Sequence, residues 1–301
     1  MTHDELQELR RKKWHTNGEP IRTLDDARAF MESVGFALMY PVQPPVLVPT
    51  FFGAYAGSDQ GLPTAQKAFA DPRAKDATEL MVRLLRERSA YEANLFGETN
   101  FLISASAFPY FYALVGDRNP KHMPKPGTRS DFSTLARDVF NAIHKHGALS
   151  KAQLHERLGG ALTDSALDRS LNDLWTRLRI TRVDYRSEEG AFWDVLFRWA
   201  PEAVREGIEA SIPEALSALA AKYVESMIAV EAAEVEEFFA QFVARAKVRE
   251  ALNALLAARE LSLTHVSNRS MLQISSRTIV PPPDPARKRP IARRPGVGAR
   301  K

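Results

Sequence analysis

The chain of 301 residues contains no cysteine. A disulfide framework, a thiolate nucleophile, an iron–sulfur cluster and a cysteine-ligated zinc site are therefore excluded. The sequence also lacks a Walker phosphate loop, a GxGxxG dinucleotide fingerprint and a GxSxG nucleophile elbow. His155-Glu156 is not followed by the second histidine of a zincin motif, and His144 and His146 project from different sides of an expected helix. We therefore expect neither a metal site nor a cofactor.

A membrane segment is not expected either. The first fourteen residues, MTHDELQELRRKKW, contain no apolar run and do not resemble a secretory signal, so we expect a cytoplasmic protein. Residues 33–58 and 99–116 carry no charge, but the first stretch contains four prolines and the second contains Pro109. Proline does not fit the interior of a spanning helix. We interpret both stretches as core segments, the first extended and the second helical with a break at Pro109.

The positive charge of the chain is confined to one end. The formal net charge is +4, from 41 basic and 37 acidic residues, but seven of the basic residues and only one acid lie in residues 281–301. Residues 1–280 thus carry a net charge of −2, which excludes a uniformly basic protein that wraps nucleic acid. Proline and glycine interleave with the basic residues of 281–301, so we expect a disordered basic tail.

The N-terminal part, residues 1–118, shows helical signals followed by aromatic residues. We expect helices over 4–16 and over 24–34, the second capped by Thr23 and ended by Gly35. Apolar spacing predicts a long helix over 75–97. The part could be a degenerate copy of the winged-helix pattern described next. The Pro/Lys/Gly-rich residues 119–128 predict a domain boundary.

Residues 129–200 show the order of a winged helix-turn-helix module. Helices are expected over 133–146, 151–158 and 163–178, with a short extended piece at 147–149 between the first two. Two alternating segments, 180–186 and 191–199, follow and predict a hairpin wing. In such modules the third helix enters the major groove of DNA.

The same order recurs in residues 211–277. Helices are expected over 213–227, 232–240 and 243–259, and strands over 261–266 and 271–274. The fold class is therefore expected to be mainly α with small β wings, built from tandem winged helix-turn-helix modules.

Three segments give a more specific indication. The runs ARAFMESVGFALMYPV (27–42), YEANLFGETNFLISASAFPYFYALV (91–115) and FRWAPEAVREGIEASIPEALSALAAKYV (197–224) are similar to segments of the crosslink-repair DNA glycosylase family, the AlkZ/YcaQ-like proteins. Together with the tandem modules, the resemblance covers most of residues 1–276. It implies a tandem winged-helix fold that acts on double-stranded DNA.

The sequence departs from that family at two places. Members that excise bases are expected to carry a Gln–apolar–Gln or Gln–apolar–Asp triplet just after the first glycine of the quoted segment. Following Gly35, this chain has Leu38 and Tyr40 at the two polar positions. The family also typically continues into a C-terminal β-barrel, whereas here the basic tail follows the last module. Both departures argue against base excision.

Hydrolysis of an N-glycosidic bond needs a polarised water and stabilisation of an oxocarbenium-like charge. Near the expected triplet only Tyr40, Gln43 and Tyr55 are available, and tyrosine is a poor base at neutral pH. Glu92 and Glu98 are the alternative acids. The catalytic candidates are therefore Tyr40, Gln43 and Glu92, although core or rim positions are the favoured interpretation of Tyr40 and Gln43.

Candidates for DNA contact are the basic and amide side chains of the opening helix, of the third helix of each module, of the last wing and of the tail. They are Arg10, Arg11, Lys12, Lys13, Arg169, Asn172, Arg177, Arg245, Lys247, Arg249, Asn253, Arg269, Arg287, Lys288, Arg289, Arg293 and Arg294. Solvated surface positions are an alternative for those outside the tail. The tail itself could instead solubilise the protein or bind another polyanion or a partner.

We therefore expect a protein that binds double-stranded DNA, damaged DNA included, through winged helices and without base excision. The first alternative is a divergent DNA glycosylase. The second is a winged-helix protein–protein adaptor, which the acidic third helix of the first module favours through Asp164, Asp168 and Asp173.

Overall fold

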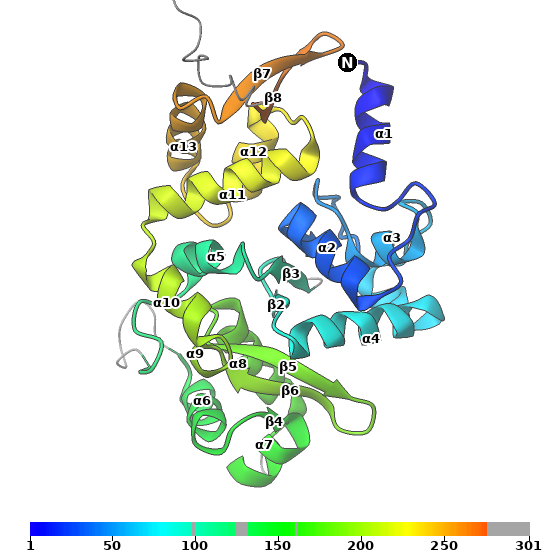
Figure 1. Cartoon of the computed structure of the whole chain (residues 1–301). Coiled ribbons are helices and arrows are strands. Elements are labelled where there is room, and N and C mark those ends of the chain that lie inside the picture. Colours follow the sequence, from blue (N-terminus) through cyan, green and yellow to red (C-terminus); the bar gives the residue numbers. More distant parts are fainter. Residues whose placement is uncertain (98–99, 124–131, 160–161, 276–301) are drawn as a thin grey trace, which may run out of the picture.

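The computed structural model describes residues 1–97, 100–123, 132–159 and 162–275. The chain is mainly α-helical, with small antiparallel sheets of two or three strands (Figure 1). This confirms the expected class of helices with small β elements. The expected tail, residues 281–301, lies outside the described residues.

The first unit, residues 24–104, consists of helices followed by a small sheet, an order of elements that recurs twice further along the chain. Its sheet has the order β1-β3-β2, and β3 pairs antiparallel with both neighbours. The unit comprises α2 (Leu24–Val34), β1 (Phe36–Leu38), α3 (Phe51–Ala56), the 3₁₀ helix η1 (Ala65–Ala70), α4 (Arg73–Arg86), β2 (Ala90–Ala93) and β3 (Phe101–Ser104).

Two sequence-based expectations within this part are wrong. The helix expected over 75–97 ends at Arg86, because Arg88 takes a positive φ of 57° that reverses the chain into β2. The aromatic segment is not one broken helix. It forms β3 and then α5 (Phe108–Val115), where Pro109 lies in the first turn and needs no amide partner.

The second unit, residues 134–195, follows the predicted element order closely. The hairpin expected from the alternating segments is confirmed, since Ile180–Arg186 pairs with Gly190–Val195, although residues 196–199 turn into a short helix. The sheet order is β4-β6-β5. The elements are α6 (Thr134–His146), β4 (Leu149–Ser150), α7 (Lys151–Leu158), α8 (Asp164–Thr176), β5 (Ile180–Arg186), β6 (Gly190–Val195) and, directly after it, α9 (Leu196–Trp199).

The third unit, residues 212–274, repeats the order once more. Val230 bridges Leu272 at the place where the other units have their short first strand. The unit consists of α11 (Ile212–Met227), α12 (Ala232–Phe239), α13 (Arg245–Ala257), β7 (Leu261–Val266) and β8 (Arg269–Ile274). The same succession of elements therefore occurs three times, once more than the sequence pattern clearly indicates.

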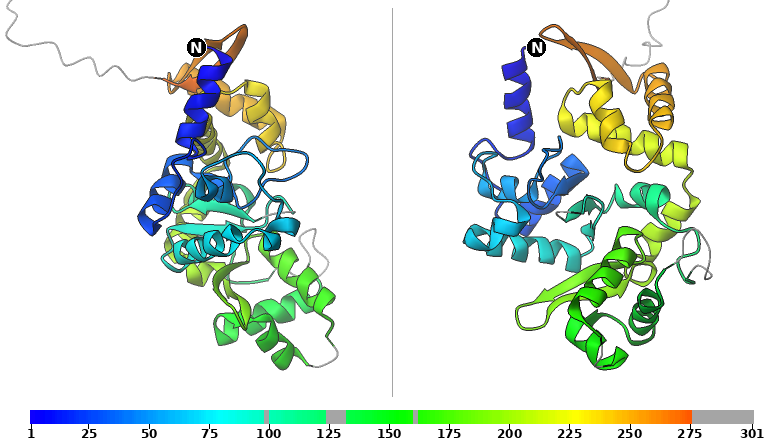
Figure 2. Two further views of the ribbon diagram at one scale, coloured as in Figure 1. Left: turned by 90° about the vertical axis from the view of Figure 1, so that its right-hand side faces the viewer. Right: turned by 180° about the vertical axis from the view of Figure 1, so that it is seen from behind.

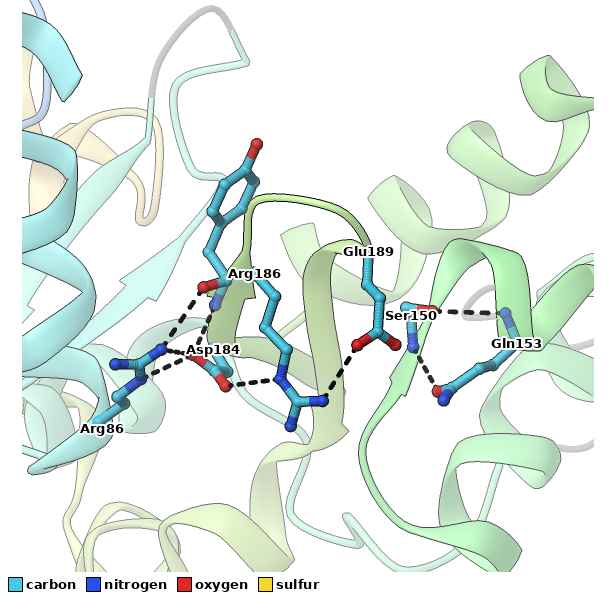
Figure 3. A network of polar contacts seen from close by, with 7 residues as sticks. Arg86, Ser150, Gln153, Asp184, Arg186 and Glu189 are labelled. Atoms are coloured by element: carbon cyan, nitrogen blue, oxygen red, sulfur yellow. Dashed lines mark hydrogen bonds and ion pairs between the residues drawn. The ribbon is translucent and has the colours of Figure 1, made fainter.

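Local signals explain where the helices begin. Thr23 and Asp26 form a reciprocal capping box at the start of α2, and Gly35 ends that helix with a φ of 79°. Ser150 and Gln153 form the same arrangement at α7 (Figure 3). These polar caps satisfy amide groups that no helical carbonyl can reach.

The three units are joined through aromatic and helical contacts. Phe36 of the first unit stacks on Tyr223 and Phe238 of the third, with ring centroids 6.1 and 5.4 Å apart. Helix α5 packs against α10 (Pro201–Glu209) and against α11. The third unit lies at one end of the molecule and the second unit at the other, with the first unit between them at one side (Figure 2).

Helix α1 (His3–Lys13) precedes the repeats and lies along the third unit. Trp14 donates a hydrogen bond from its indole to the carbonyl of Ser226, 3.0 Å away. In the part of the chain that the structure describes, no helix has the length and apolarity needed to cross a bilayer.

Candidate functional site

A cleft of about 900 Å³ lies between the first unit and the β5–β6 turn of the second. One wall comes from η1 and α4, and the other from Tyr185 and Ser187. We call it the inter-unit cleft. The side chains that line it are Tyr40, Ala68, Phe69, Asp71, Pro72, Ala74, Lys75, Thr78, Glu79, Val82, Arg86, Tyr185 and Ser187.

A smaller recess of about 180 Å³ adjoins this cleft, and the two share Tyr40, Thr78, Val82 and Tyr185. Apolar side chains of α4 and of the residues directly after β1 meet polar groups of β2 and β5 there. The complete lining is Met39, Tyr40, Thr78, Met81, Val82, Leu85, Glu92, Asn100, Arg182, Asp184 and Tyr185. The recess thus combines apolar walls with a few polar groups, as ligand sites commonly do.

A buried ion pair contributes to the recess. The side chain of Glu92 has no exposed surface, and its Oε1 accepts a hydrogen bond of 2.6 Å from Nη2 of Arg182. The backbone carbonyl of Glu92 accepts two more hydrogen bonds from the second unit, from Trp175 Nε1 at 3.0 Å and from Thr181 Oγ1 at 2.9 Å. The strand β2 is therefore tied to the second unit at Glu92.

Part of this ion pair is left without a partner. Among the described residues, neither Glu92 Oε2 nor Arg182 Nε has a hydrogen-bond partner, although both atoms are buried. The guanidinium lies over the ring of Trp175, 4.5 Å from its centroid. Burial raises the pKa of Glu92, and the nearby charge of Arg182 opposes that rise.

The three catalytic candidates occupy different environments. Glu92 lines the recess, and Tyr40 lines both the recess and the cleft. Gln43 is exposed on the loop after β1 and is not among the residues that line either cavity. The structure thus brings Tyr40 and Glu92 together and leaves Gln43 aside. Glu98 lies outside the described residues.

The positions of the expected polar triplet are both buried. Leu38 is only 1% exposed and belongs to the core shared with the third unit. Burial raises the pKa of Tyr40, and a hydrogen bond with Thr78 acts in the opposite direction. Neither side chain is suited to polarise a water at neutral pH.

A chain of ionic contacts forms the edge of the cleft (Figure 3). Arg86 of α4 pairs with Asp184 of β5 at 2.6 Å, and Arg186 pairs with the other oxygen of Asp184 at 3.5 Å and with Glu189 at 3.1 Å. Arg86 also reaches the carbonyl of Tyr185 at 3.5 Å. These contacts hold the turn of the second unit against α4.

The assignment of Arg10 to DNA contact is wrong. Its guanidinium is buried and donates to the carbonyls of Met227, at 2.9 Å, and Ala229, at 2.5 Å, where it caps the C-terminus of α11. Its neighbours in the cluster lie nearer the surface: Lys12 is exposed, Arg11 pairs with Glu8 at 3.4 Å and Lys13 with Glu225 at 3.5 Å.

The candidates on α8 are exposed or partly exposed but already have partners within the protein. Asn172 accepts a hydrogen bond from Asn94 of the first unit, Arg169 donates to the carbonyl of Ser165, and Arg177 pairs with Asp173. The two other aspartates that favour an adaptor are also paired, Asp164 with His155 and Asp168 with Lys151. The acidic charge of this helix is therefore largely compensated.

The candidates on α13 and the last wing are exposed. They are Arg245, Lys247, Arg249, Asn253 and Arg269. Three of them form surface ion pairs: Lys247 with Glu250, Arg249 with Glu236, and Arg269 with Glu231. Exposed ion pairs of this kind contribute little to stability. The tail candidates Arg287, Lys288, Arg289, Arg293 and Arg294 lie outside the described residues.

Residues of the site that sequence reasoning missed include Phe69, Arg86, Arg182 and Tyr185. Phe69 projects from η1 with 90% of its surface exposed. No periodic pattern marks it. Arg182 meets Glu92 across 90 residues of sequence, so only the folded chain brings them together.

Comparisons with known proteins identify one family and one similar fold. A family model described as DNA glycosylase AlkZ-like matches residues 65–293. The solved structure of Streptomyces sahachiroi DNA glycosylase AlkZ has a similar fold, with a TM-score of 0.55 and 15% sequence identity over 91% of this chain and 70% of that one. No curated protein matches the chain in sequence.

Proposed function

Because the chain belongs to the AlkZ-like DNA glycosylase family, we propose that it binds double-stranded DNA through winged-helix units and does so without excising bases. One observation carries this proposal. At the two positions where base-excising members are expected to have a polar pair, the chain places Leu38 in the core and a desolvated Tyr40 beside the cleft. The frame of the family is retained, while the groups expected to activate water are replaced.

Hydrolysis of an N-glycosidic bond requires a group that holds and deprotonates water. A tyrosine whose pKa is raised above its usual value remains protonated at neutral pH and does not accept that proton. Gln43 neither titrates nor lines the cleft. Neither Tyr40 nor Gln43 therefore supports a hydrolytic step.

The repeated units support DNA contact. Each has the order of a winged helix, and in that fold the third helix enters the major groove. The third helices are α4, α8 and α13, and both α4 and α13 carry several exposed cations, four on α4 and three on α13. The basic residues of 281–301 add six net positive charges that are able to contact phosphates.

The experiment uses the full chain and a fluorescently labelled duplex. Anisotropy at low salt is expected to report binding that weakens steeply as salt is added. The same protein, in excess over alkylated or crosslinked duplex, is expected to leave no strand breaks after alkali treatment. Absence of DNA retention at low salt would overturn the binding proposal and favour the protein adaptor. Alkali-labile product would overturn the non-enzymatic part.

A divergent glycosylase is the second candidate, because Glu92 lines the recess with one oxygen that has no protein partner. A general acid or base works best when its pKa is near the working pH, and burial raises the pKa of Glu92 in that direction. If excision is observed, its loss in Glu92→Gln and its persistence in Gln43→Ala would assign the reaction to Glu92.

A further inference from the structure

We propose that the inter-unit cleft and its recess bind one unpaired nucleotide of a DNA strand, with the base stacked on Phe69 and Tyr185 and its edge directed to Glu92 and Arg182. This inference rests on the proposed binding of DNA and names the part of the DNA that this site would take. It does not require excision.

Two exposed aromatic side chains border the cleft. Phe69 is 90% exposed and Tyr185 is 48% exposed, and they come from opposite walls, η1 and the end of β5. Large aromatic side chains are usually buried, so an exposed pair at one cleft needs an explanation. The faces of nucleobases stack on aromatic rings irrespective of sequence.

The charge of the cleft favours a base over the phosphate backbone. Its lining includes the cations Lys75 and Arg86 and the carboxylates Asp71 and Glu79, so the charges balance. Asp71 is engaged by Arg73, and Arg86 by Asp184. A nearly neutral cleft with aromatic borders gives little attraction for phosphate but suits a flat uncharged ring.

The recess supplies the groups that would contact the edge of that ring. Glu92 Oε2 is a hydrogen-bond acceptor and Arg182 Nε a donor, and both are buried without a protein partner. Leaving such atoms unpaired costs stability, so buried ion pairs are normally completed by further hydrogen bonds. Each nucleobase presents neighbouring donors and acceptors on its pairing edge. An acceptor and a donor left over from the same ion pair are complementary to such an edge.

The site selects an unpaired base because the pairing edge of a base within a duplex is already occupied. The recess holds about 180 Å³, which is small for a ligand pocket and has no room for a base pair. Extruding a base costs several kcal/mol in a perfect duplex and least where the base is unpaired from the start. The chain should therefore prefer a duplex with a single-nucleotide bulge.

The test compares two labelled duplexes that differ only by one bulged nucleotide, with the full chain and anisotropy as the readout. Wild-type protein is expected to bind the bulged duplex at least roughly tenfold more tightly than the duplex without the bulge. Phe69→Ala and Tyr185→Ala should each reduce that ratio toward one, because loss of one stacking partner is worth roughly a five- to hundredfold change in affinity. Both residues are exposed, so these variants are expected to fold.

Leu263→Ala serves as the matched control, because Leu263 is also an exposed apolar residue, at 62%, but lies on β7 of the third unit. It is expected to leave the ratio unchanged. Equal affinity of the wild type for both duplexes, or a preference that survives in both aromatic variants, would overturn the inference while DNA binding stands. Failure to bind either duplex would overturn the proposed function itself. Glu92→Gln adds an independent measurement and should also lower the ratio, provided that its circular dichroism matches the wild type.

Discussion

Glu92 of β2 and Arg182 of β5 form an ion pair of 2.6 Å that joins the first unit to the second. The carboxylate is completely buried, while the guanidinium side chain keeps 22% of its surface exposed. One oxygen of Glu92 therefore ties the two units together, while the other has no hydrogen-bond partner among the described residues, although Glu92 lines the recess.

Truncation of Glu92 is expected to destabilise the protein. In Glu92→Ala the largely buried charge of Arg182 loses its partner, which costs about 3 kcal/mol. Arg86→Ala is the control across the same interface, because its pair with Asp184 is more exposed and contributes about 1 kcal/mol or less. Urea unfolding of both variants measures the difference. Equal losses would contradict the special role assigned to the Glu92 pair.

The contribution of Glu92 to stability should depend on pH. Burial raises its folded-state pKa above the ordinary value of 4.5. A carboxyl with a raised folded pKa contributes stability below the unfolded pKa, and this contribution is lost as pH rises through the folded pKa. The free energy of unfolding of the wild type minus that of Glu92→Gln should therefore decrease from about pH 4 upward and then become constant. Paired urea titrations test this. A difference that grows with pH would mean that the charge of Arg182 outweighs desolvation.

Arg10 and Lys12 should behave in opposite ways despite being neighbours in one basic cluster. Arg10→Ala removes two hydrogen bonds to the carbonyls that end α11, and we expect a loss of about 3 kcal/mol. Lys12 is exposed, so Lys12→Ala should change stability by about 0.5 kcal/mol or less. Thermal and urea unfolding compare the two. A tolerated Arg10→Ala would show that the buried guanidinium does not anchor α1.

Deleting residues 281–301 should flatten the salt dependence of DNA affinity. The deletion removes seven basic residues and one acid. If several of these cations bind phosphates, the slope of log affinity against log salt should become shallower by nearly one for each phosphate that is no longer neutralised. Anisotropy titrations at several salt concentrations give the slope. An unchanged slope would remove these residues from the DNA interface.

The sequence predicts the helices well where polar caps mark their ends. Thr23 and Gly35 bound α2, and Ser150 begins α7, as the structure has them. The structure of residues 87–97 is harder to predict from the sequence. Its strand β2 is buried on both faces, and a short run of buried residues cannot be told from a continuing helix by periodicity. The prediction of a helix through residue 97 fails for that reason.

The candidate site was predictable only in part. Tyr40 follows from its spacing after Gly35, and Glu92 from the scarcity of acids nearby. Their common cavity, however, depends on how the second unit docks on the first. Arg182 is one of several arginines in an alternating strand, and no local pattern assigns it to a carboxylate 90 residues away.

Hydrogen exchange of the full chain, measured with and without a bulged duplex, tests most directly whether the inter-unit cleft faces DNA. Bound DNA is expected to slow amide exchange in peptides covering 65–79 and 184–189, the two walls of the cleft. Peptides covering the exposed end of α7 should remain unchanged. Protection confined to α13 and the last wing, with no change in either wall, would contradict the account.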